Sequence, residues 1–437
     1  MRAALEYHRA TNVRAGDETY GMDLEKVVDT RPPPFHDYGD AERLPLEASV
    51  AGPLLQDGAG IVRSQAGRDY GGGTIHWRAY SSAGALFPVE AYVAAPDGLY
   101  SFDALSRALV RIGGDDPLTG VADAAGVAAD VEAFVVLTGI LGRTGWKYLE
   151  RGYRHVWWDA GTMLANLLAL AAAAGLRPRL WTAFVDRELN DLLGVDGVGE
   201  AALAVLALGS GSSARPHEQP VQRPSRNPGT RRFPLAEAAH VASSLVEREA
   251  VQSWRGALEG QEPALAYDKL RRAIARRRSV RAYASGPLPR DGLAELLAWS
   301  EAPIPADAPR AVRQLVTVAA VEGLEPGTYD ANLRLMRSHD AATLRERVGF
   351  AAMEQEFPRL AAANVFQLVD LDDVVGQLGD RGYRWAQLEA GIRAGRLQVG
   401  AFMRGWGSSA STFYDDEVSR LLETPEAPML MVAIGRL

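Results

Sequence analysis

The sequence predicts an α+β protein made of two tandem copies of one domain. Two observations support this class: the same motifs recur in order in both halves, and helical runs outweigh short β-like runs and separate them. A third is size, because 437 residues with 47% apolar side chains are enough for two cores. We expect each copy to hold a central, mostly antiparallel sheet flanked by helices, and the copies to pack as a pseudo-two-fold dimer.

The repeat consists of four motifs with nearly constant spacing. In the first half they are Gly-Tyr-Arg at 152–154, Asp-Ala-Gly at 159–161, Phe-Val-Asp-Arg-Glu-Leu at 184–189 and Leu-Leu at 192–193. In the second half they recur as Gly-Tyr-Arg at 382–384, Glu-Ala-Gly at 389–391, Phe-Tyr-Asp-Asp-Glu-Val at 413–418 and Leu-Leu at 421–422. The offset is 230 residues before the end of the intervening helix and 229 after it, which indicates a tandem duplication.

A stretch rich in Gly, Ser and Pro separates the halves. Residues 209–229 lack periodic apolar residues, which is typical of an extended linker. We therefore divide the chain into an N-terminal domain (1–208), a linker (209–234) and a C-terminal domain (235–437). The charged N-terminus lacks the apolar stretch of a signal peptide, and the longest apolar run, 164–176, is too short to span a bilayer. We expect a cytoplasmic protein that does not enter a membrane.

Periodicity places the main elements on either side of the linker. Amphipathic helices are expected at 159–174, 236–256, 267–278 and 389–404, and strands at 87–95 and 314–320. Each half also closes with a β-like run, at 201–208 and 429–434. A terminal strand in each half favours a sheet at the centre of each domain.

Composition excludes several kinds of chemistry. The formal charge of −8 argues against a nucleic-acid-wrapping protein, which needs an excess of basic side chains. The absence of cysteine excludes disulfides, thiolate nucleophiles, iron–sulfur clusters and cysteine-based zinc sites. The seven histidines have no metal-binding spacing, and no dinucleotide-binding, phosphate-loop, zinc-protease or nucleophile-elbow motif is present.

The first candidate site is the basic run after the helix expected at 267–278. Arg277, Ser279 and Arg281 alternate, so in an extended segment they point to the same side. Two guanidinium groups and a hydroxyl suit a phosphate. The alternative is a solvated basic end that complements the helix dipole.

Two segments of small residues are candidates for close contact with a flat ligand. They are Ser81, Ser82, Ala83 and Gly84, before the strand expected at 87–95, and Ser409, Ala410 and Ser411, within 405–413 after a long helix. Small side chains let the backbone approach a ligand, and exposed N–H groups suit an electron-rich edge. The alternatives are an ordinary loop before a strand and a glycine C-cap followed by a turn.

The last candidate is the pair Lys147 and Tyr148. Lys147 is one of only three lysines and lies between two aromatic residues, Trp146 and Tyr148. Partial desolvation beside apolar rings favours the neutral, basic form of an ammonium group. The alternative is a surface helix with a cation–π contact.

Taken together, these motifs resemble the FMN-dependent nitroreductase-like superfamily, and within it the SagB-type dehydrogenases, the azoline oxidases of thiazole- and oxazole-containing peptide biosynthesis. The resemblance covers most of both halves apart from the linker and residues 14–51. An R-x-S-x-R stretch binds the FMN phosphate and ribityl chain in that superfamily, which implies this role for Arg277, Ser279 and Arg281. A small-residue loop from the other subunit touches the flavin, which implies contact from residues 81–84.

The resemblance extends to two further segments. Residues 405–413 are similar to a glycine-rich loop that presents N–H groups to the isoalloxazine, but are one residue shorter and carry Ser411 and Thr412 where glycine is expected. Arg436 resembles a second phosphate contact. Lys147 and Tyr148 match a Lys-Tyr pair that is linked to catalysis in the azoline oxidases.

The counterparts of these motifs elsewhere in the chain have diverged. In the first half, residues 9–13 correspond to the basic run at 277–281 and keep one arginine and a hydroxyl. In the second half, residues 303–307 correspond to the small-residue loop at 81–84 and lack its serines. Residues 175–178 depart from the glycine-rich loop. Because the superfamily builds each site from two subunits, this split implies one composite site, one FMN per chain and an empty or vestigial second pocket.

The implied activity is oxidation of peptide thiazolines or oxazolines. Lys147, with Tyr148 as its partner or as the alternative base, removes the α-proton while the flavin accepts a hydride. A modified precursor peptide and a cyclodehydratase are the implied partners. One alternative is an NAD(P)H-dependent nitro, quinone or enone reductase on the same fold. A second is a flavin-free, non-catalytic scaffold, which the shortened segment 405–413 keeps open.

Overall fold

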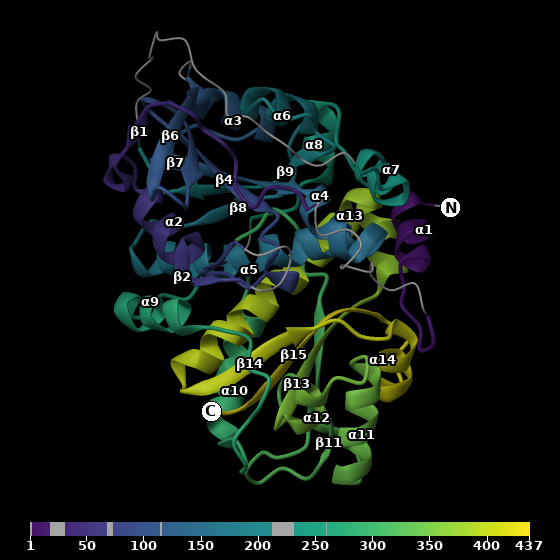
Figure 1. Cartoon of the computed structure of the whole chain (residues 1–437). Helices are drawn as coiled ribbons and strands as arrows, with labels where there is room; N and C mark the ends of the chain where they lie inside the picture. The colour runs from purple at the N-terminus through teal and green to yellow at the C-terminus, as the bar shows by residue number, and fades with distance from the viewer. Residues whose placement is uncertain (1, 18–30, 68–72, 114–115, 212–230, 259) are drawn as a thin grey trace.

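The computed structural model describes residues 2–17, 31–67, 73–113, 116–211, 231–258 and 260–437. Most of the predicted linker, residues 212–230, lies outside the described residues. Figure 1 shows one sheet on each side of a central pair of long helices, α5 (Gly152–Ala173) and α13 (Leu371–Met403). The predicted α+β class with two similar halves is confirmed.

The first half contains a seven-stranded antiparallel sheet in the order β1-β6-β5-β4-β7-β9-β8. Its strands are β1 (Arg43–Leu44), β4 (Val89–Ala95), β5 (Gly98–Asp103), β6 (Ala108–Gly113), β7 (Ala133–Ile140), β8 (Arg179–Trp181) and β9 (Glu200–Leu208). Besides α5, its helices are α1 (Ala3–Ala10), α2 (Ala51–Ala59), α3 (Pro117–Ala125), α4 (Leu141–Tyr148) and α6 (Asp186–Leu193). A separate two-stranded hairpin, β2 (Ile61–Ala66) and β3 (Thr74–Arg78), lies between α2 and β4.

The second half repeats this topology with a six-stranded sheet in the order β12-β11-β10-β13-β15-β14. Its strands are β10 (Arg313–Val318), β11 (Gly327–Asp330), β12 (Leu335–Ser338), β13 (Ala363–Val369), β14 (Trp406–Ser411) and β15 (Ala427–Arg436). Besides α13, its helices are α7 (Pro234–Ala242), α8 (Arg248–Trp254), α9 (Tyr267–Arg276), α10 (Arg290–Glu301), α11 (Ala341–Ala351), α12 (Glu356–Leu360) and α14 (Asp415–Leu422). No counterpart of the β2–β3 hairpin lies among its described strands.

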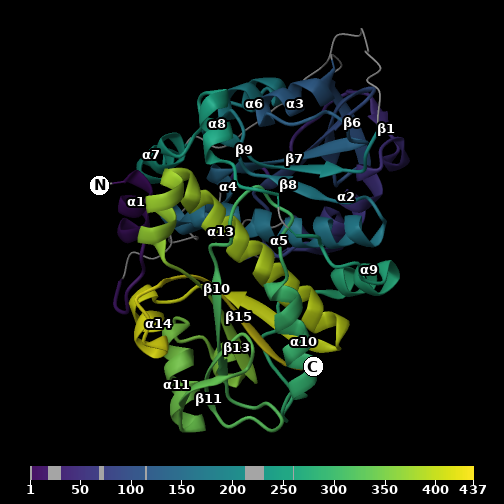
Figure 2. The ribbon, with the colours of Figure 1, turned by 180° about the vertical axis from the view of Figure 1, so that it is seen from behind.

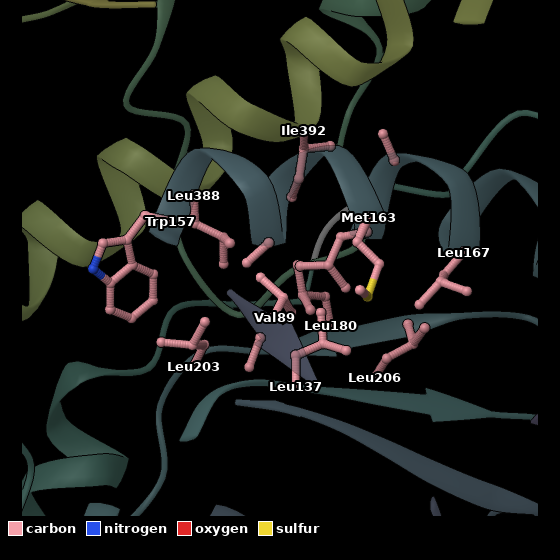
Figure 3. Packing of buried hydrophobic residues seen from close by; sticks show 14 of the residues in the cluster. Val89, Leu137, Trp157, Met163, Leu167, Leu180, Leu203, Leu206, Leu388 and Ile392 are labelled. Carbon is pink, nitrogen blue, oxygen red and sulfur yellow. The ribbon is translucent and has the colours of Figure 1, made fainter. Parts of the chain in front are cut away.

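Helix α5 is buried between the first sheet and α13. Its side chains Trp157, Met163 and Leu167 pack on the sheet, while Leu388 and Ile392 approach from α13 (Figure 3). The run 141–173 is long and apolar enough to cross a membrane by composition, and 89% of its most apolar window is buried inside the protein. It is therefore the core helix of this fold.

The two long helices cross at the glycines of the repeated Asp/Glu-Ala-Gly motif. A Cβ atom on Gly161 would lie 2.5 Å from the Leu388 carbonyl oxygen, and one on Gly391 would lie 2.6 Å from the Trp158 carbonyl oxygen. Neither backbone could accept a side chain at this separation. The pseudo-two-fold packing thus depends on glycine at both positions. Figure 2 shows α5 and α13 from the opposite side.

Two equivalent ionic clusters tie the halves together. Arg151, directly before α5, and Arg154 of α5 contact Asp415, at 2.8 and 3.0 Å, and Arg154 also donates to Thr11. All of these side chains are buried. The cluster joins the segment after α1 to the second half.

The matching cluster lies 229–232 residues away at each position. Arg381 and Arg384 of α13 contact Asp186, each at 2.6 Å, and Arg384 donates to Ser243 after α7. Although burial raises it, the two guanidinium groups leave the pKa of Asp186 below its ordinary value. Each half therefore sends its first helix across to the other half.

These clusters correct two sequence-based expectations. The helix expected at 236–256 is interrupted, because Arg384 captures Ser243 and the carbonyl of His240, and α7 and α8 are separate helices. Residues 9–13 are the equivalent of 241–245 and not of the basic clamp at 277–281. The reason is that the Val13 N–H donates to the carboxylate of Asp415 and the Leu245 N–H donates to that of Asp186. The helix expected at 267–278 and the strands at 87–95 and 314–320 are present as α9, β4 and β10.

Replacing either cluster carboxylate should destabilise the protein strongly. Asp186→Asn and Asp415→Asn would each leave buried guanidinium groups without their counter-ion, and we expect a loss of about 3–5 kcal/mol in the free energy of unfolding. Asp416→Asn is the matched control, because its half-exposed ion pair with Arg420 is worth less than about 1 kcal/mol. Urea unfolding would show equal effects of the control and the cluster variants if the clusters were not structural.

Acid should destabilise the fold through two equivalent histidines. Burial, and then the guanidinium groups of Arg154 and Arg384, lower the pKa of His8 and of His240 well below the ordinary value. The unfolded chain therefore binds more protons than the folded one below about pH 6.5, and stability falls as pH falls. We expect melting temperatures between pH 7.5 and 5 to fall less in the double variant His8→Gln/His240→Gln than in the wild type or in the exposed-strand control His76→Gln.

Candidate functional site

A cleft between the halves collects most of the side chains singled out in the sequence. It consists of two adjoining cavities of about 160 and 670 Å³, which share Ser81, Ser82, Gly84, Ser279 and Arg281 in their walls. The small-residue loop comes from the first half and the basic run from the second. The cleft is therefore a composite of both halves.

Arg277 connects these two walls directly. Its Nη2 donates to the Tyr80 carbonyl oxygen at 3.0 Å, and burial lowers its pKa to about 10, against the opposing effect of Asp159. Ser279 runs beside Ser408 of β14, because the Val280 N–H donates to the Ser408 carbonyl at 3.1 Å. The exit from α9 is thus extended, as the alternation of 277, 279 and 281 predicts.

Asp159 anchors the small-residue loop onto α5. Its carboxylate accepts from the Ser82 hydroxyl at 2.5 Å and from the Ala83 N–H at 3.1 Å, and Ser82 in turn accepts from the Phe87 N–H at 2.8 Å. Burial raises the pKa of Asp159 well above its ordinary value, although Ser82, Ala83 and Arg277 oppose the shift. Gly84 has φ +61°, so the loop reverses where a side chain would be strained.

Lys147 and Tyr148 end α4 against this loop. The ideal Cβ position of Gly84 is 3.0 Å from the Tyr148 hydroxyl and 3.4 Å from Cδ of Lys147. Lys147 lies in the wall of the larger cavity and Tyr148 in that of the smaller one. The Lys147 ammonium is 5.4 Å from the Tyr148 ring centroid, so the predicted cation–π contact is also present.

His155 supports Tyr148 from below. The two rings stack with centroids 4.2 Å apart and planes 14° apart. Burial lowers the pKa of His155 to about 3, so the imidazole is neutral, and its Nδ1–H donates to the Arg151 carbonyl at 3.0 Å. This bond fixes the tautomer with the proton on Nδ1, so Nε2 is a hydrogen-bond acceptor. The imidazole ring lines the smaller cavity.

The segment 405–413 is a strand rather than the expected loop. Gly405, with φ +74°, ends α13, and β14 then pairs with β15. Ala410, Ser411 and Thr412 line the smaller cavity, and Ser411 accepts from the Gln355 amide at 2.8 Å. The glycine C-cap of the alternative interpretation is therefore present, but a strand and not a turn follows it.

Two predicted residues lie apart from the cleft walls. Ser409 is buried in β14, opposite Ala433. Arg436 is exposed near the end of β15, with its guanidinium beside Gly286. Neither lines the two cavities, so the structure does not bring Arg436 to the clamp.

Sequence reasoning missed several side chains of the smaller cavity. They are His155, Trp158, Asp159, Thr162 and Gln355. Four of them lie on α5, whose composition reads as a buried core helix. The repeat did contain a signal, because the Asp of its Asp-Ala-Gly motif is the loop anchor.

The pseudo-equivalent position in the other half is closed by the chain itself. Asp307, which is fully buried, accepts from the Thr182 N–H at 2.7 Å and the Ala183 N–H at 3.1 Å. Its neighbour Ala306 bridges to Leu180 of β8 in the way that Ser279 bridges to Ser408. The carboxylate of Asp307 thus accepts hydrogen bonds from the backbone N–H groups of Thr182 and Ala183, which are the repeat equivalents of Ser411 and Thr412.

This arrangement corrects the expected pairing of 303–307 with the small-residue loop. Glu389 is the repeat partner of Asp159, and its carboxylate accepts from the N–H groups of Ala311 and Val312. Those two residues are therefore the counterpart of the loop. No shared side chain marks this equivalence, and only the common carboxylate contact shows it.

Comparison with known proteins agrees with this architecture. A model described as the nitroreductase family matches residues 51–210 and 274–436. A nitroreductase-type protein of Methanocaldococcus jannaschii is 30% identical over 195 residues, which cover 41% of this chain and 96% of that protein.

Two solved structures are also similar. The crystal structure of a nitroreductase-type protein from Anabaena variabilis has a TM-score of 0.82 and 25% identity, covering 100% of this chain and 99% of its own. A chain of the Escherichia coli microcin synthetase McbBCD complex, with truncated pro-MccB17 bound, has a TM-score of 0.32 and 23% identity, covering 42% of this chain and 70% of its own. A TM-score this low carries no inference about substrate. Since the family model covers most of the chain in two successive regions, the protein belongs to the nitroreductase family, with two nitroreductase-fold domains in one chain.

Proposed function

We propose that this protein is an FMN-dependent dehydrogenase that oxidises thiazoline or oxazoline rings of a modified peptide to thiazoles or oxazoles. The observation that carries the proposal is the Lys147–Tyr148 pair packed on Gly84 at the wall of the composite cleft. The coarser description, a nitroreductase-type oxidoreductase, follows from family membership. A precursor peptide and a cyclodehydratase that forms its rings are the proposed partners.

The residues of the cleft fit FMN. Arg277, Ser279 and Arg281 are suited to the phosphate and ribityl chain, and residues 81–84 let the backbone approach a planar ring. Thr412 Oγ1 is buried in the smaller cavity without a hydrogen-bond partner among the described residues, which suits a ligand with polar ring atoms. The two cavities together lie in the range of about 300–1,000 Å³ that ligand sites span.

The chain's own groups supply the acid–base part of the reaction. Aromatising an azoline removes a proton from the α-carbon and a hydride from the β-carbon, and bound FMN supplies the redox chemistry by accepting the hydride. Lys147, as the neutral amine, takes the α-proton and becomes an ammonium group, and Tyr148, held against His155, positions the amine and the ring of the substrate. The direct test is mass spectrometry of a heterocyclised peptide incubated with the FMN-loaded protein, which should show a loss of about 2 Da per ring.

Other outcomes would identify other functions. An unchanged peptide mass, with rapid bleaching of the flavin by NADPH that does not need Lys147, would identify an NAD(P)H-dependent reductase. A purified protein that lacks flavin absorbance and does not bind added FMN would identify a non-catalytic scaffold. Each outcome contradicts the azoline oxidation proposed above.

The chain should bind one FMN and not two. Asp307 fills the equivalent donor position in the other half, so we expect a stoichiometry near one by calorimetry. Arg277→Ala should raise the Kd for FMN by about 10- to 100-fold, because charge-assisted hydrogen bonds contribute about 1.5–3 kcal/mol. Arg310→Ala, at the counterpart cavity, is the control and should leave FMN binding unchanged. Two bound FMN molecules would contradict the assignment of Asp307.

Lys147 should be needed for turnover but not for FMN binding. Lys147→Met should lower kcat for azoline oxidation by about 10²- to 10⁴-fold, the usual contribution of a positioned base, with the flavin spectrum retained. Lys269→Met removes an exposed lysine of α9 and is the matched control. Full activity of the Lys147 variant would exclude this residue as the base.

A further inference from the structure

The larger cavity of the cleft is strongly basic. Eight of its nineteen lining residues are Arg or Lys, and none is Asp or Glu. The whole chain carries a formal charge of −8, so this concentration of positive charge does not reflect the overall composition. A cleft lined by one sign of charge attracts ligands of the opposite sign.

FMN accounts for only part of this charge. Arg78 is paired with Glu90 at 3.6 Å, a carboxylate that also binds Arg143 at 2.6 Å, and Arg277 and Arg281 are the groups assigned to FMN above. Apart from Arg31 and Lys147, which have other contacts, three cations remain: Arg63, Arg276 and Arg278. None of these three forms an ion pair with a described residue. We call these three residues the basic mouth. A flavin phosphate carries at most about two negative charges and does not balance all five guanidinium groups.

The basic mouth has two walls from different halves. Arg63 comes from β2 and lies over the Trp77 ring of β3 at 3.8 Å, which holds its guanidinium at the cleft. Arg276 is the last residue of α9 and Arg278 follows it, and both line the same cavity as Arg63 of β2 (Figure 1 shows α9 below β2). The β2–β3 hairpin occurs only in the first half among the described strands, so the mouth belongs to the open site alone.

The shape of the hairpin favours an extended ligand. β2 and β3 pair only with each other among the described strands, so each presents an outer edge of backbone groups. Val62 and Ile75 add apolar surface beside the guanidinium groups. Backbone edges, apolar positions and fixed cations together match an extended peptide with acidic side chains.

We propose that the basic mouth binds an acidic segment of the peptide substrate and leads the ring beside it to Lys147. This inference rests on the proposed function, because it assumes a peptide substrate. It assigns the substrate class: a peptide with Asp or Glu residues close to the ring that is oxidised.

Direct binding tests the proposal without turnover. Two fluorescein-labelled peptides of equal length, one with Glu and one with Gln beside the ring, would be titrated with the FMN-loaded protein. We expect anisotropy to show at least about tenfold tighter binding of the Glu peptide at low salt, and loss of that preference near 1 M NaCl, where screening acts within about 3 Å.

Charge reversal locates the effect. In Arg63→Glu/Arg276→Glu the preference for the Glu peptide should disappear, and the ratio of flavin to protein absorbance checks that FMN is retained. Arg334→Glu, a reversal at an exposed residue between β11 and β12, is the matched control and should keep the preference. Equal binding of both peptides by the wild type, or a preference that survives in the double variant, would overturn the proposal.

A further arm separates this inference from other failures. If NADPH binding, rather than peptide binding, is lost in the double variant, the mouth is a nucleotide site and the proposal is wrong. If the Glu peptide binds as expected but no peptide loses about 2 Da, the binding inference stands and the proposed azoline oxidation fails.

Discussion

The close crossing of α5 and α13 is the constraint on which the rest of the structure depends. Gly161 and Gly391 bring the two backbones together where any side chain would overlap a carbonyl group. This contact lies on the pseudo-two-fold axis and sets how closely the two halves approach each other. Asp159 and Glu389, each two residues before its crossing glycine, occupy equivalent positions in the two halves. Each carboxylate accepts a hydrogen bond from the backbone of a neighbouring segment and anchors it.

The two ionic clusters show how the halves are held in register. In each cluster, two arginines on or directly before a central helix bind one aspartate of the other half: Asp415 in the first cluster and Asp186 in the second. The same arginines also bind the segment that follows the first helix of their own half. Buried ion pairs contribute little net stability but are costly to break. Their function here is to exclude other relative positions of the halves, which keeps the walls of the composite cleft together.

The sequence predicted the architecture because duplication leaves a signal that needs no knowledge of contacts. The motifs at 152–154 and 382–384 recur in order, and amphipathic periodicity located α9, β4 and β10 close to their ends. The family resemblance also predicted that Arg277 meets the loop at 81–84, and Arg277 donates to the carbonyl oxygen of Tyr80, directly before that loop. That they hold FMN remains a prediction.

What the sequence did not reveal depends on contacts between distant residues. The break between α7 and α8 arises because Arg384 binds Ser243, which lies 141 positions away. Asp159 and His155 look like ordinary residues of a core helix until the loop and Tyr148 are placed beside them. The chain's own closure of the second pocket requires Asp307 to meet β8, and no local pattern marks it.

Asp307 also changes how this protein can vary. In an assembly of identical subunits, each substitution appears in both pockets at once. Here the two pockets are encoded by different codons, so a mutation that damages one need not reach the other. The closed half retains a cavity of about 410 Å³, walled by Trp254, Trp385 and Glu389, that is released from the requirements of the flavin chemistry. Substitutions in the walls of that cavity leave the side chains of the composite cleft unchanged.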